Sequence, residues 1–503
     1  MMQSRVFTNT GPETGPNTGR ETLDEIRSFI NRTWDESIVP TLCEYIKIPN
    51  KSPMFDPDWQ EHGYMHNAIE LFNEWCANSD LKNLSHRIVQ IEGRTPLLFC
   101  EIPANTNSPN ETPTVLLYGH YDKQPEFSGW RDGLEPWKPV IQDGRLYGRG
   151  GADDGYALFG SLTAIMALQN ANLPHPRCVI LIEGCEESGS YDLPYYVELL
   201  AEEIGTPALV ICLDAECANY DQLWITTSLR GTVAGTLKVR VLREGIHSGA
   251  ASGIVPSSFR IARQLLERIE NANSGLMHEK LYVPIPAKVK EQTRIMARAL
   301  GKQVYERFPW SKNTGPMNDT TYAMILNNTW EPTLSVTGIS GAPEVGNAGN
   351  TLRPETQLKL SVRLPPTLDA QAAAGLLKNL LETDPPYDAE VIFEVENAQS
   401  GWAGPEIEDR LAACFQQASQ NNFDSPVQYM PMGGTIPFMK MLGEGYPGVQ
   451  FMVTGVLGPA SNAHGPNEFL HIETGKRLTA CVADVLAKIA VTSQAVPDKG
   501  SSA

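Results

Sequence analysis

The chain has 503 residues, 41% hydrophobic and 20% charged. This is the balance of a globular protein too long for one simple core, so two domains are expected. The formal net charge of −19 argues against nucleic acid or an anionic membrane as a partner, because both require a basic surface.

The expected compartment is the cytoplasm. No uncharged apolar run approaches the roughly 18 residues of a membrane span, and the polar N-terminus lacks the apolar core of a secretory signal. Nine cysteines are scattered without a CxxC pair, and Cys178 and Cys212 lie inside apolar segments. This pattern favours reduced thiols in a reducing compartment.

The first part of the chain predicts an α/β domain with a mainly parallel sheet. Residues 1–21 and 491–503 are expected to be disordered tails. Apolar residues recur at helical spacing from Thr22 to about Tyr45, where Pro40 should kink or divide the helix. Beyond it, helices and strands alternate as in βαβ units: helix 66–77, strand 114–118, helix 155–170, strand 178–183, helix 193–204 and strand 208–213.

From about residue 227 the pattern changes to a ferredoxin-like order of strands and helices. The predicted elements are strand 232–242, helix 256–271, a long irregular stretch, strands near 332–338 and 356–364, helix 369–382 and strand 389–396. We therefore expect 227–397 to be an inserted α+β domain that acts as a lid and dimerises. The catalytic domain would comprise 22–226 and 398–490, ending with a buried strand at 447–454 and a helix at 473–490.

Acidic and histidine residues stand where apolar strands of the first domain give way to loops. Ligands in open α/β sheets bind beyond the carboxyl ends of the strands, so these side chains are expected to converge. Imidazole and carboxylate groups without thiolate suit zinc, manganese or cobalt rather than a structural zinc knot. The residues are His120, Asp122, Asp153, Asp154, Glu186, Glu187, Asp214 and His464.

Each motif also has a structural interpretation when taken alone. His120 could be a satisfied structural histidine whose tautomer Asp122 fixes, and one of Asp153 and Asp154 could cap the following helix. Adjacent Glu186 and Glu187 after an apolar strand would destabilise the fold if buried without partners. A metal would explain one as a ligand, and the other would be the general base beside a metal-bound water. The combination of five strand ends in this order favours a two-metal hydrolase.

The chain resembles a family of dinuclear metallopeptidases that includes carnosinase-like dipeptidases, glutamate carboxypeptidase, desuccinylases and aminoacylases. The resemblance covers about residues 22–490 and is strongest for the branch of carnosinase and cytosolic nonspecific dipeptidase. It is carried by Tyr-Gly-His120-Tyr-Asp122, Gly-Arg-Gly-x-x-Asp153-Asp154, Glu-Gly-x-Glu186-Glu187-Ser-Gly-Ser, Asp214, Arg230-Gly, His247-Ser-Gly and His464.

The resemblance implies two divalent metal ions, with zinc the first expectation and manganese or cobalt as alternatives. Asp153 would bridge them and join Asp154 through a cis peptide bond. His120 and Asp214 would complete one site, and Glu187 and His464 the other. A water between the metals would lose its proton to Glu186, while Asp122 would orient His120.

The resemblance also implies residues that bind the substrate. His247 would reach across a homodimer interface to stabilise the oxyanion, and Arg363 would bind the C-terminal carboxylate of the substrate. Asn350, Thr351, Gly434 and Thr435 match substrate-contacting positions more loosely. Two departures from the branch concern specificity: Gly155 and Tyr156 follow the paired aspartates, and Pro431-Met432 precedes Gly433-Gly434.

The resulting prediction is metal-dependent hydrolysis of the amide bond of a dipeptide or short peptide with a free carboxylate. An N-acyl-amino-acid deacylase or desuccinylase of the same architecture is an alternative, as is a non-catalytic binding homologue. A dinuclear phosphohydrolase would need more cationic groups than His247 and Arg363 supply.

Overall fold

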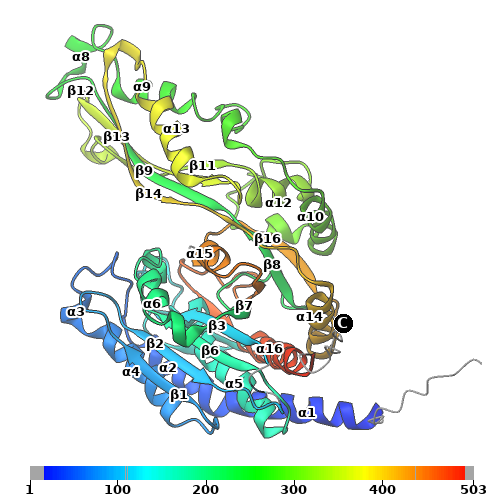
Figure 1. Ribbon diagram of the computed structural model, residues 1–503. Coiled ribbons are helices and arrows are strands. Elements are labelled where there is room, and N and C mark those ends of the chain that lie inside the picture. The colour runs from blue at the N-terminus through cyan, green and yellow to red at the C-terminus, as the bar shows by residue number, and fades with distance from the viewer. Residues whose placement is uncertain (1–15, 108, 110–111, 437, 493–503) are drawn as a thin grey trace, which may run out of the picture.

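The largest sheet of the protein has six strands in the order β1-β2-β6-β3-β7-β17 (Figure 1). The computed structural model describes residues 16–107, 109, 112–436 and 438–492. β6, β3, β7 and β17 are parallel, whereas β2 is antiparallel to β1 and β6. The predicted mainly parallel sheet is confirmed. In sheet order, the strands span Ser85–Val89, Leu97–Ile102, Arg177–Glu183, Thr114–His120, Pro207–Cys212 and Gln450–Val453.

Helices cover both faces of this sheet because alternate strand residues point to opposite sides. Leu117 and Ile180 pack into one core, and Leu116 and Val179 into the other. The first core is closed by α1 (Pro16–Thr33), α2 (Val39–Ile46), α4 (Tyr64–Ala77), α5 (Ala157–Asn170), α14 (Asp409–Phe423) and α16 (Ile472–Thr492). The second is closed by α6 (Leu193–Leu199), α7 (Ala201–Ile204) and α15 (Phe438–Gly445).

The N-terminal helix is irregular near Pro40, as predicted. A π-helical turn, η1 (Trp34–Ile38), separates α1 from α2, in which Pro40 is the second residue. A widened turn is a common cause of such an irregularity. The predicted N-terminal tail, 1–21, is too long, because α1 begins at Pro16 rather than near Thr22. Residues 1–15 and 493–503 of the predicted tails lie outside the described residues.

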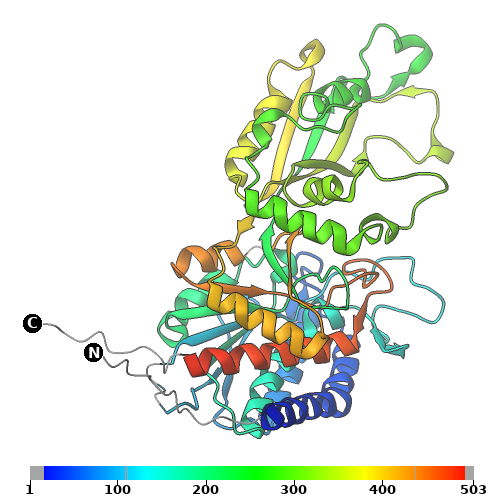
Figure 2. The same cartoon turned by 90° about the vertical axis from the view of Figure 1, so that its right-hand side faces the viewer.

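A second sheet has four antiparallel strands in the order β11-β13-β9-β14, and α9 and α13 pack against it in one core. The chain order β9-α9-β11-β13-α13-β14 is the predicted ferredoxin-like order. Both views place this sheet apart from the six-stranded one (Figures 1 and 2). The elements are β9 (Gly231–Arg240), α9 (Ser258–Leu266), β11 (Thr333–Ser340), β13 (Glu355–Leu364), α13 (Ala370–Glu382) and β14 (Glu390–Gln399).

The stretch expected to be irregular between α9 and β11 is instead largely helical. It contains α10 (Ala287–Leu300), α11 (Gln303–Glu306) and α12 (Thr321–Thr329). Met296 of α10 and Ile325 of α12 share a small core with Trp224 and Met430. These helices therefore fill the junction between the two parts of the molecule.

Smaller sheets and turns complete the described chain. β15 (Trp402–Ala403), β8 (Trp224–Leu229) and β16 (Gln428–Met432) form a sheet at the junction. β18 (Phe469–His471), β5 (Arg145–Tyr147) and β4 (Val140–Gln142) form another. β10 (Ile246–His247) pairs with β12 (Thr351–Leu352). The remaining short elements are α3 (Trp59–His62), α8 (Ser248–Ala251), η3 (Gly151–Gly155), η4 (Glu186–Ser188), η5 (Glu279–Leu281), η6 (Val345–Asn347) and η7 (Pro386–Asp388).

All nine cysteines are free thiols, in line with the expectation from their spacing. Within the described ranges, no helix is both long enough and apolar enough to cross a membrane.

The contact between η1 and α16 generates a stability prediction at Gly475. Trp34 is fully buried, its indole N–H donates to Thr479 Oγ1 at 3.0 Å, and a Cβ on Gly475 would lie 2.3 Å from the Trp34 ring. Gly475→Ala should therefore destabilise the protein by about 1–3 kcal/mol through overpacking. Gly375→Ala, in α13 with open space around it, should be neutral or stabilise by up to about 1 kcal/mol. Thermal unfolding midpoints that shift equally for both variants would contradict this packing argument.

Candidate metal centre

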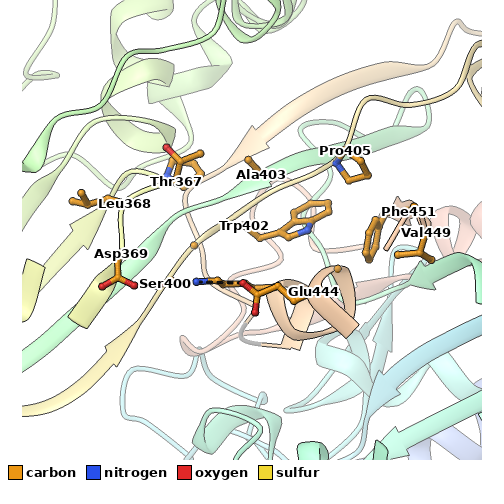
Figure 3. Close-up of a pocket in the computed structure, with 15 residues that line it drawn as sticks. Thr367, Leu368, Asp369, Ser400, Trp402, Ala403, Pro405, Glu444, Val449 and Phe451 are labelled. Carbon is orange, nitrogen blue, oxygen red and sulfur yellow. Dashed lines mark ion pairs between the residues drawn. The ribbon is translucent and has the colours of Figure 1, made fainter. Parts of the chain in front are cut away.

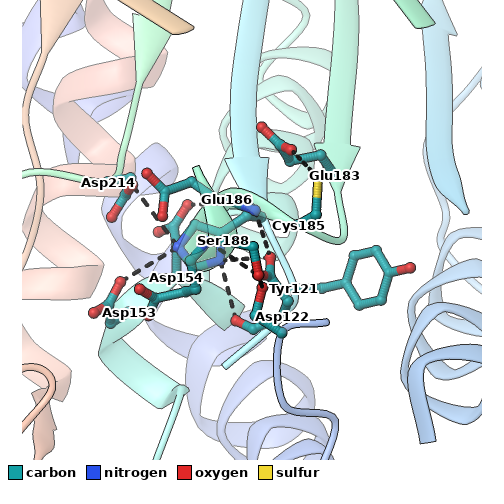
Figure 4. A network of polar contacts seen from close by, with 12 residues as sticks. Tyr121, Asp122, Asp153, Asp154, Glu183, Cys185, Glu186, Ser188 and Asp214 are labelled. Carbon is teal, nitrogen blue, oxygen red and sulfur yellow. Dashed lines mark hydrogen bonds and ion pairs between the residues drawn. The ribbon is translucent and has the colours of Figure 1, made fainter. Parts of the chain in front are cut away.

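The predicted acidic side chains Asp122, Asp153, Asp154, Glu186 and Asp214 gather beyond the carboxyl ends of the parallel strands (Figure 4). His120 ends β3, Glu186 and Glu187 form the turn η4 after β6, and Asp214 follows β7. Asp153 and Asp154 come from the turn η3 that precedes α5, and His464 lies in the loop between β17 and β18. The sequence-based expectation that these side chains converge is therefore confirmed.

Asp122 holds two parts of the site together. His120 Nδ1 lies 3.1 Å from the carbonyl oxygen of Asp122 and 3.3 Å from its Oδ1. The same carboxylate accepts hydrogen bonds from the backbone N–H of Glu186 at 3.1 Å and of Glu187 at 3.0 Å. Asp122 thus faces the ring of His120, as predicted, and also fixes the turn that presents both glutamates. The spacing in the sequence indicated only the first of these contacts.

Asp153 lies between the two histidines. Its Oδ1 is 3.3 Å from His120 Nε2, and its Oδ2 is 3.1 Å from His464 Nε2. His464 Nε2 is also 3.3 Å from Glu187 Oε2, and Asp214 Oδ2 is 3.8 Å from His120 Nε2. The peptide bond between Asp153 and Asp154 is cis, as the family resemblance implied.

The electrostatics of the site are those of a buried excess of negative charge. Burial raises the pKa of Glu187 to about 7 against the attraction of His464. Burial and then repulsion from Asp214 raise the pKa of Glu186 well above its usual range. Burial opposes a charged imidazole at His120, yet the carboxylates around it, led by Asp214, raise its pKa.

The donor set fits divalent metal ions. Within the described residues, two groups have potential ligand atoms within 4.8 Å of one another: His120 with Glu186 and Asp214, and His120 with Asp153 and Glu187. His464 adjoins the second group through its contacts with Asp153 and Glu187. Carboxylate and imidazole ligands suit zinc, manganese and cobalt. Because Glu186 and Glu187 both belong to these groups, their separate roles as base and ligand stay predictions.

A buried ion pair that the sequence did not reveal supports two of the loops. Arg149 pairs with Glu468, and both side chains are buried. Arg149 also donates to the carbonyl oxygen of Gly465 at 2.8 Å, and the N–H of Gly150 donates to Glu468 Oε1 at 2.9 Å. The pair thereby connects the loop before Asp153 with the loop that carries His464. The only signal was an arginine inside a Gly-rich run and a glutamate four residues after a histidine.

Arg363 lies at the junction between the two large sheets, together with Arg230 and Thr435. Arg363 Nη1 donates to Thr435 Oγ1 at 3.1 Å, and Thr435 Oγ1 donates to the carbonyl oxygen of Arg230. Arg230 also donates to the carbonyl oxygen of Gly433 at 3.1 Å, next to Gly434. Burial, followed by repulsion from Arg363, lowers the pKa of Arg230 to about 9. Among the described residues, neither guanidinium forms an ion pair.

His247, Asn350 and Thr351 lie together at the far end of the four-stranded sheet. His247 is the register partner of Thr351, and the N–H of Ser248 donates to the carbonyl oxygen of Asn350 at 2.8 Å. Their neighbouring elements α8 and β12 are remote from β3, β6 and β7 (Figure 1). A single chain therefore does not bring these three residues to its own metal centre, and their roles stay predictions.

Comparisons with known proteins agree on one family. A model described as "Peptidase family M20/M25/M40" matches residues 116–488. The cysteinylglycine-S-conjugate dipeptidase of Corynebacterium striatum is 26% identical over 71% of this chain and 77% of its own. The Beta-Ala-His dipeptidase of Rattus norvegicus is 25% identical over 75% of each. The solved structure of the di-peptidase Dug1p from Saccharomyces cerevisiae shares the fold, with 20% identity, a TM-score of 0.76 and coverage of 93% and 98%.

Proposed function

This chain belongs to peptidase family M20/M25/M40, and we propose that it hydrolyses dipeptides or short peptides that end in a free carboxylate. The observation that carries the proposal is the pairing of an acidic, histidine-containing centre with two neighbouring guanidinium groups, the buried Arg230 and the half-buried Arg363, which have no carboxylate partner among the described residues. A substrate carboxylate would supply the missing negative charge at the guanidinium groups. The dipeptidase names of the relatives support the same substrate class.

Two divalent ions, zinc as the first choice, would be held by His120, Asp153, Asp214, Glu187 and His464. When bound, such ions supply Lewis acidity toward water and toward the substrate carbonyl. Glu186 would take the proton of the attacking water and pass it to the leaving amine nitrogen, which is a general base followed by a general acid step. Asp122 would keep both the imidazole and the turn η4 in place for this transfer.

Arg363 would bind the α-carboxylate of the substrate. Its Nη1 is held by Thr435, which leaves its other N–H groups for a charge-assisted contact. Arg230, Gly434 and Thr435 would shape the wall around that carboxylate. An N-acyl-amino-acid deacylase would use the same contact, so the leaving group distinguishes the dipeptidase from the deacylase.

We further propose a homodimer formed through the domain at 227–397, the lid, with the catalytic domain made of 22–226 and 398–490. The edge strand β11 carries exposed apolar side chains, Val336 at 49% and Ile339 at 64% exposure. Exposed apolar edge strands favour pairing with another chain. In such a dimer the partner subunit's His247 would approach the metal centre and stabilise the oxyanion of the substrate. Asn350 and Thr351 would accompany it.

The free thiols support a reducing compartment, and we propose that the protein acts in the cytoplasm without nucleic acid or a membrane as partner.

The two adjacent glutamates should respond differently to the same substitution. Glu186→Gln should retain both metals and lose about 10²–10⁴-fold in turnover, because only a general base is removed. Glu187→Gln should lower the metal content, since a ligand is lost. Glu135→Gln, at an exposed surface ion pair, is the matched control. Metal analysis and dipeptide turnover test the assignment, which fails if both variants are fully loaded and active.

Sharing of the site between subunits can be tested by mixing two inactive variants. Random exchange of His247→Ala and Glu186→Gln subunits gives mixed dimers with one intact site, and about a quarter of wild-type activity is expected. Neither variant alone should be active. Mixed dimers verified by mass that recover no activity would leave His247 structural or acting within its own chain.

If Arg363 binds the free carboxylate, removing either partner of this contact should lower kcat/KM. A charge-assisted contact contributes roughly 1.5–3 kcal/mol, so Arg363→Ala should lower kcat/KM by about 10–100-fold. C-terminal amidation should cause a similar loss with the wild-type enzyme, and the two losses should not add. Arg410→Ala, at an exposed position of α14, is the control and should leave kcat/KM unchanged for both the free and the amidated substrate.

The same assay separates the two candidate reactions when it includes N-acetyl and N-succinyl amino acids beside dipeptides. Preference for the acyl compounds would replace the dipeptidase by the deacylase. Equal cleavage of amidated and free dipeptides would refute the carboxylate contact.

A further inference from the structure

A cavity of about 430 Å³ lies at the hinge between the two large sheets, outside the metal centre. This is within the range of small-molecule sites, roughly 300–1,000 Å³, which often occur where domains meet. One wall comes from the segment between β13 and α13, and the other from α15 and the start of β17. Figure 3 shows these walls, with Trp402 between Thr367, Leu368 and Asp369 on one side and Val449 and Phe451 on the other.

The cavity adjoins the segments through which the chain enters and leaves the four-stranded sheet. These segments cross in contact: a Cβ on Gly401 would lie 2.5 Å from the carbonyl oxygen of Leu229 and 2.8 Å from the Cα of Pro366. A Cβ on Gly231 would lie 2.8 Å from the N atom of Gly401. A molecule that fills the cavity would touch Pro366 and Gly401, which pack against the entering segment, and would restrict bending there.

The wall is apolar around Trp402, whose indole N–H is an unpaired donor among the described residues. Trp402 is only 6% exposed and packs edge-on against Phe451, with ring centroids 5.1 Å apart. No acceptor within the described residues takes its indole N–H, whereas buried tryptophan N–H groups usually have a partner. This nitrogen lies 3.7 Å from where a Cβ on Gly443 would stand, and Gly443 lines the cavity. The N–H therefore faces the space that a ligand would occupy.

The rim carries one cation, Lys440, and two carboxylates, Glu444 and Asp369. Lys440 and Glu444 of α15 lie 3.8 Å apart and are both open to solvent. A carboxylate near Lys440 could accept the Trp402 N–H, and an ammonium group could lie beside Glu444. An apolar side chain would then contact Phe451. These requirements together describe a zwitterionic amino acid.

We propose that this hinge cavity binds one free α-amino acid with an apolar side chain and that the bound amino acid restrains the lid. The binding stands on the cavity alone. Its regulatory consequence rests on the proposed function, because free amino acids are then products of the reaction.

Calorimetric titration of the full-length protein with L-leucine tests the binding. The Glu186→Gln background excludes turnover, and added Arg363→Ala removes the carboxylate contact proposed for the catalytic site. Leucine should still bind this double variant, and Gly443→Leu should abolish the binding by filling the cavity. Gly375→Leu, at an open helical position of α13, is the matched control and should leave the binding intact.

A second variant keeps the test independent of how Gly443→Leu folds. Trp402→Phe keeps an aromatic ring but removes the donor, and should weaken leucine binding by about 10–100-fold, the range for a hydrogen bond to a charged group. Leucinamide and 4-methylpentanoate, which lack one charge each, should bind more weakly than leucine.

The proposal is overturned if leucine does not bind at millimolar concentrations, if Gly443→Leu and Trp402→Phe both leave its affinity unchanged, or if Arg363→Ala alone abolishes binding. Absence of peptidase activity would refute the proposed function but would leave the calorimetric result standing. Leucine should alter dipeptide turnover in the wild-type enzyme and not in Gly443→Leu.

Discussion

The concentration of buried carboxylates beyond the parallel strands is the constraint on which the rest of the structure depends. Mutual repulsion and loss of hydration disfavour such a cluster, as the raised pKa values of Glu186 and Asp214, caused first by burial, indicate. Hydrogen bonds from backbone groups therefore fix the loops that carry these carboxylates. Asp122 accepts two N–H groups of the turn η4, and Glu468 accepts the N–H of Gly150 as well as Arg149. A rigid apolar sheet holds these loops together, and divalent cations would complete the charge balance.

The sequence predicted the gathering of His120, Glu187 and Asp214 because each of them stands at or shortly after the end of an apolar parallel strand. Parallel strands bring their carboxyl ends to one edge, so the one-dimensional pattern determines the gathering of His120, Glu187 and Asp214. The second contact of Asp122 and the pair of Arg149 with Glu468 could not be predicted in this way. Both contacts join residues that are 64 or more positions apart, and the local spacing of residues in the sequence does not indicate such contacts.

The fold shows the same division between local and distant information. The strands and helices with long apolar or periodic patterns were predicted, including the ferredoxin-like order of the inserted segment. The helices α10 to α12 were mistaken for irregular structure because prolines and glycines interrupt the stretch and much of α10 is exposed. What stabilises them is a small core with Trp224 and Met430, residues from distant strands. Tertiary packing thus outweighed the low helix propensity of this stretch of the sequence.

The arrangement separates opposite charges along the path that a substrate would follow. Negative groups gather at the metal centre, whereas the buried Arg230 and the half-buried Arg363 lie at the hinge without a carboxylate partner among the described residues. Placing two like cations side by side with little hydration is unfavourable unless an anion binds to them. In the proposed reaction, that anion is the substrate's own carboxylate, and the span from the arginines to the metals would set how many residues lie between it and the cleaved bond. Because Arg363 lies in β13 and Arg230 directly precedes β9, the orientation of the four-stranded sheet would determine this span. Bending at the hinge would therefore change both the binding of the substrate carboxylate and the position of the cleaved bond at the metals. For this reason a ligand in the cavity beside Trp402 would influence the reaction directly.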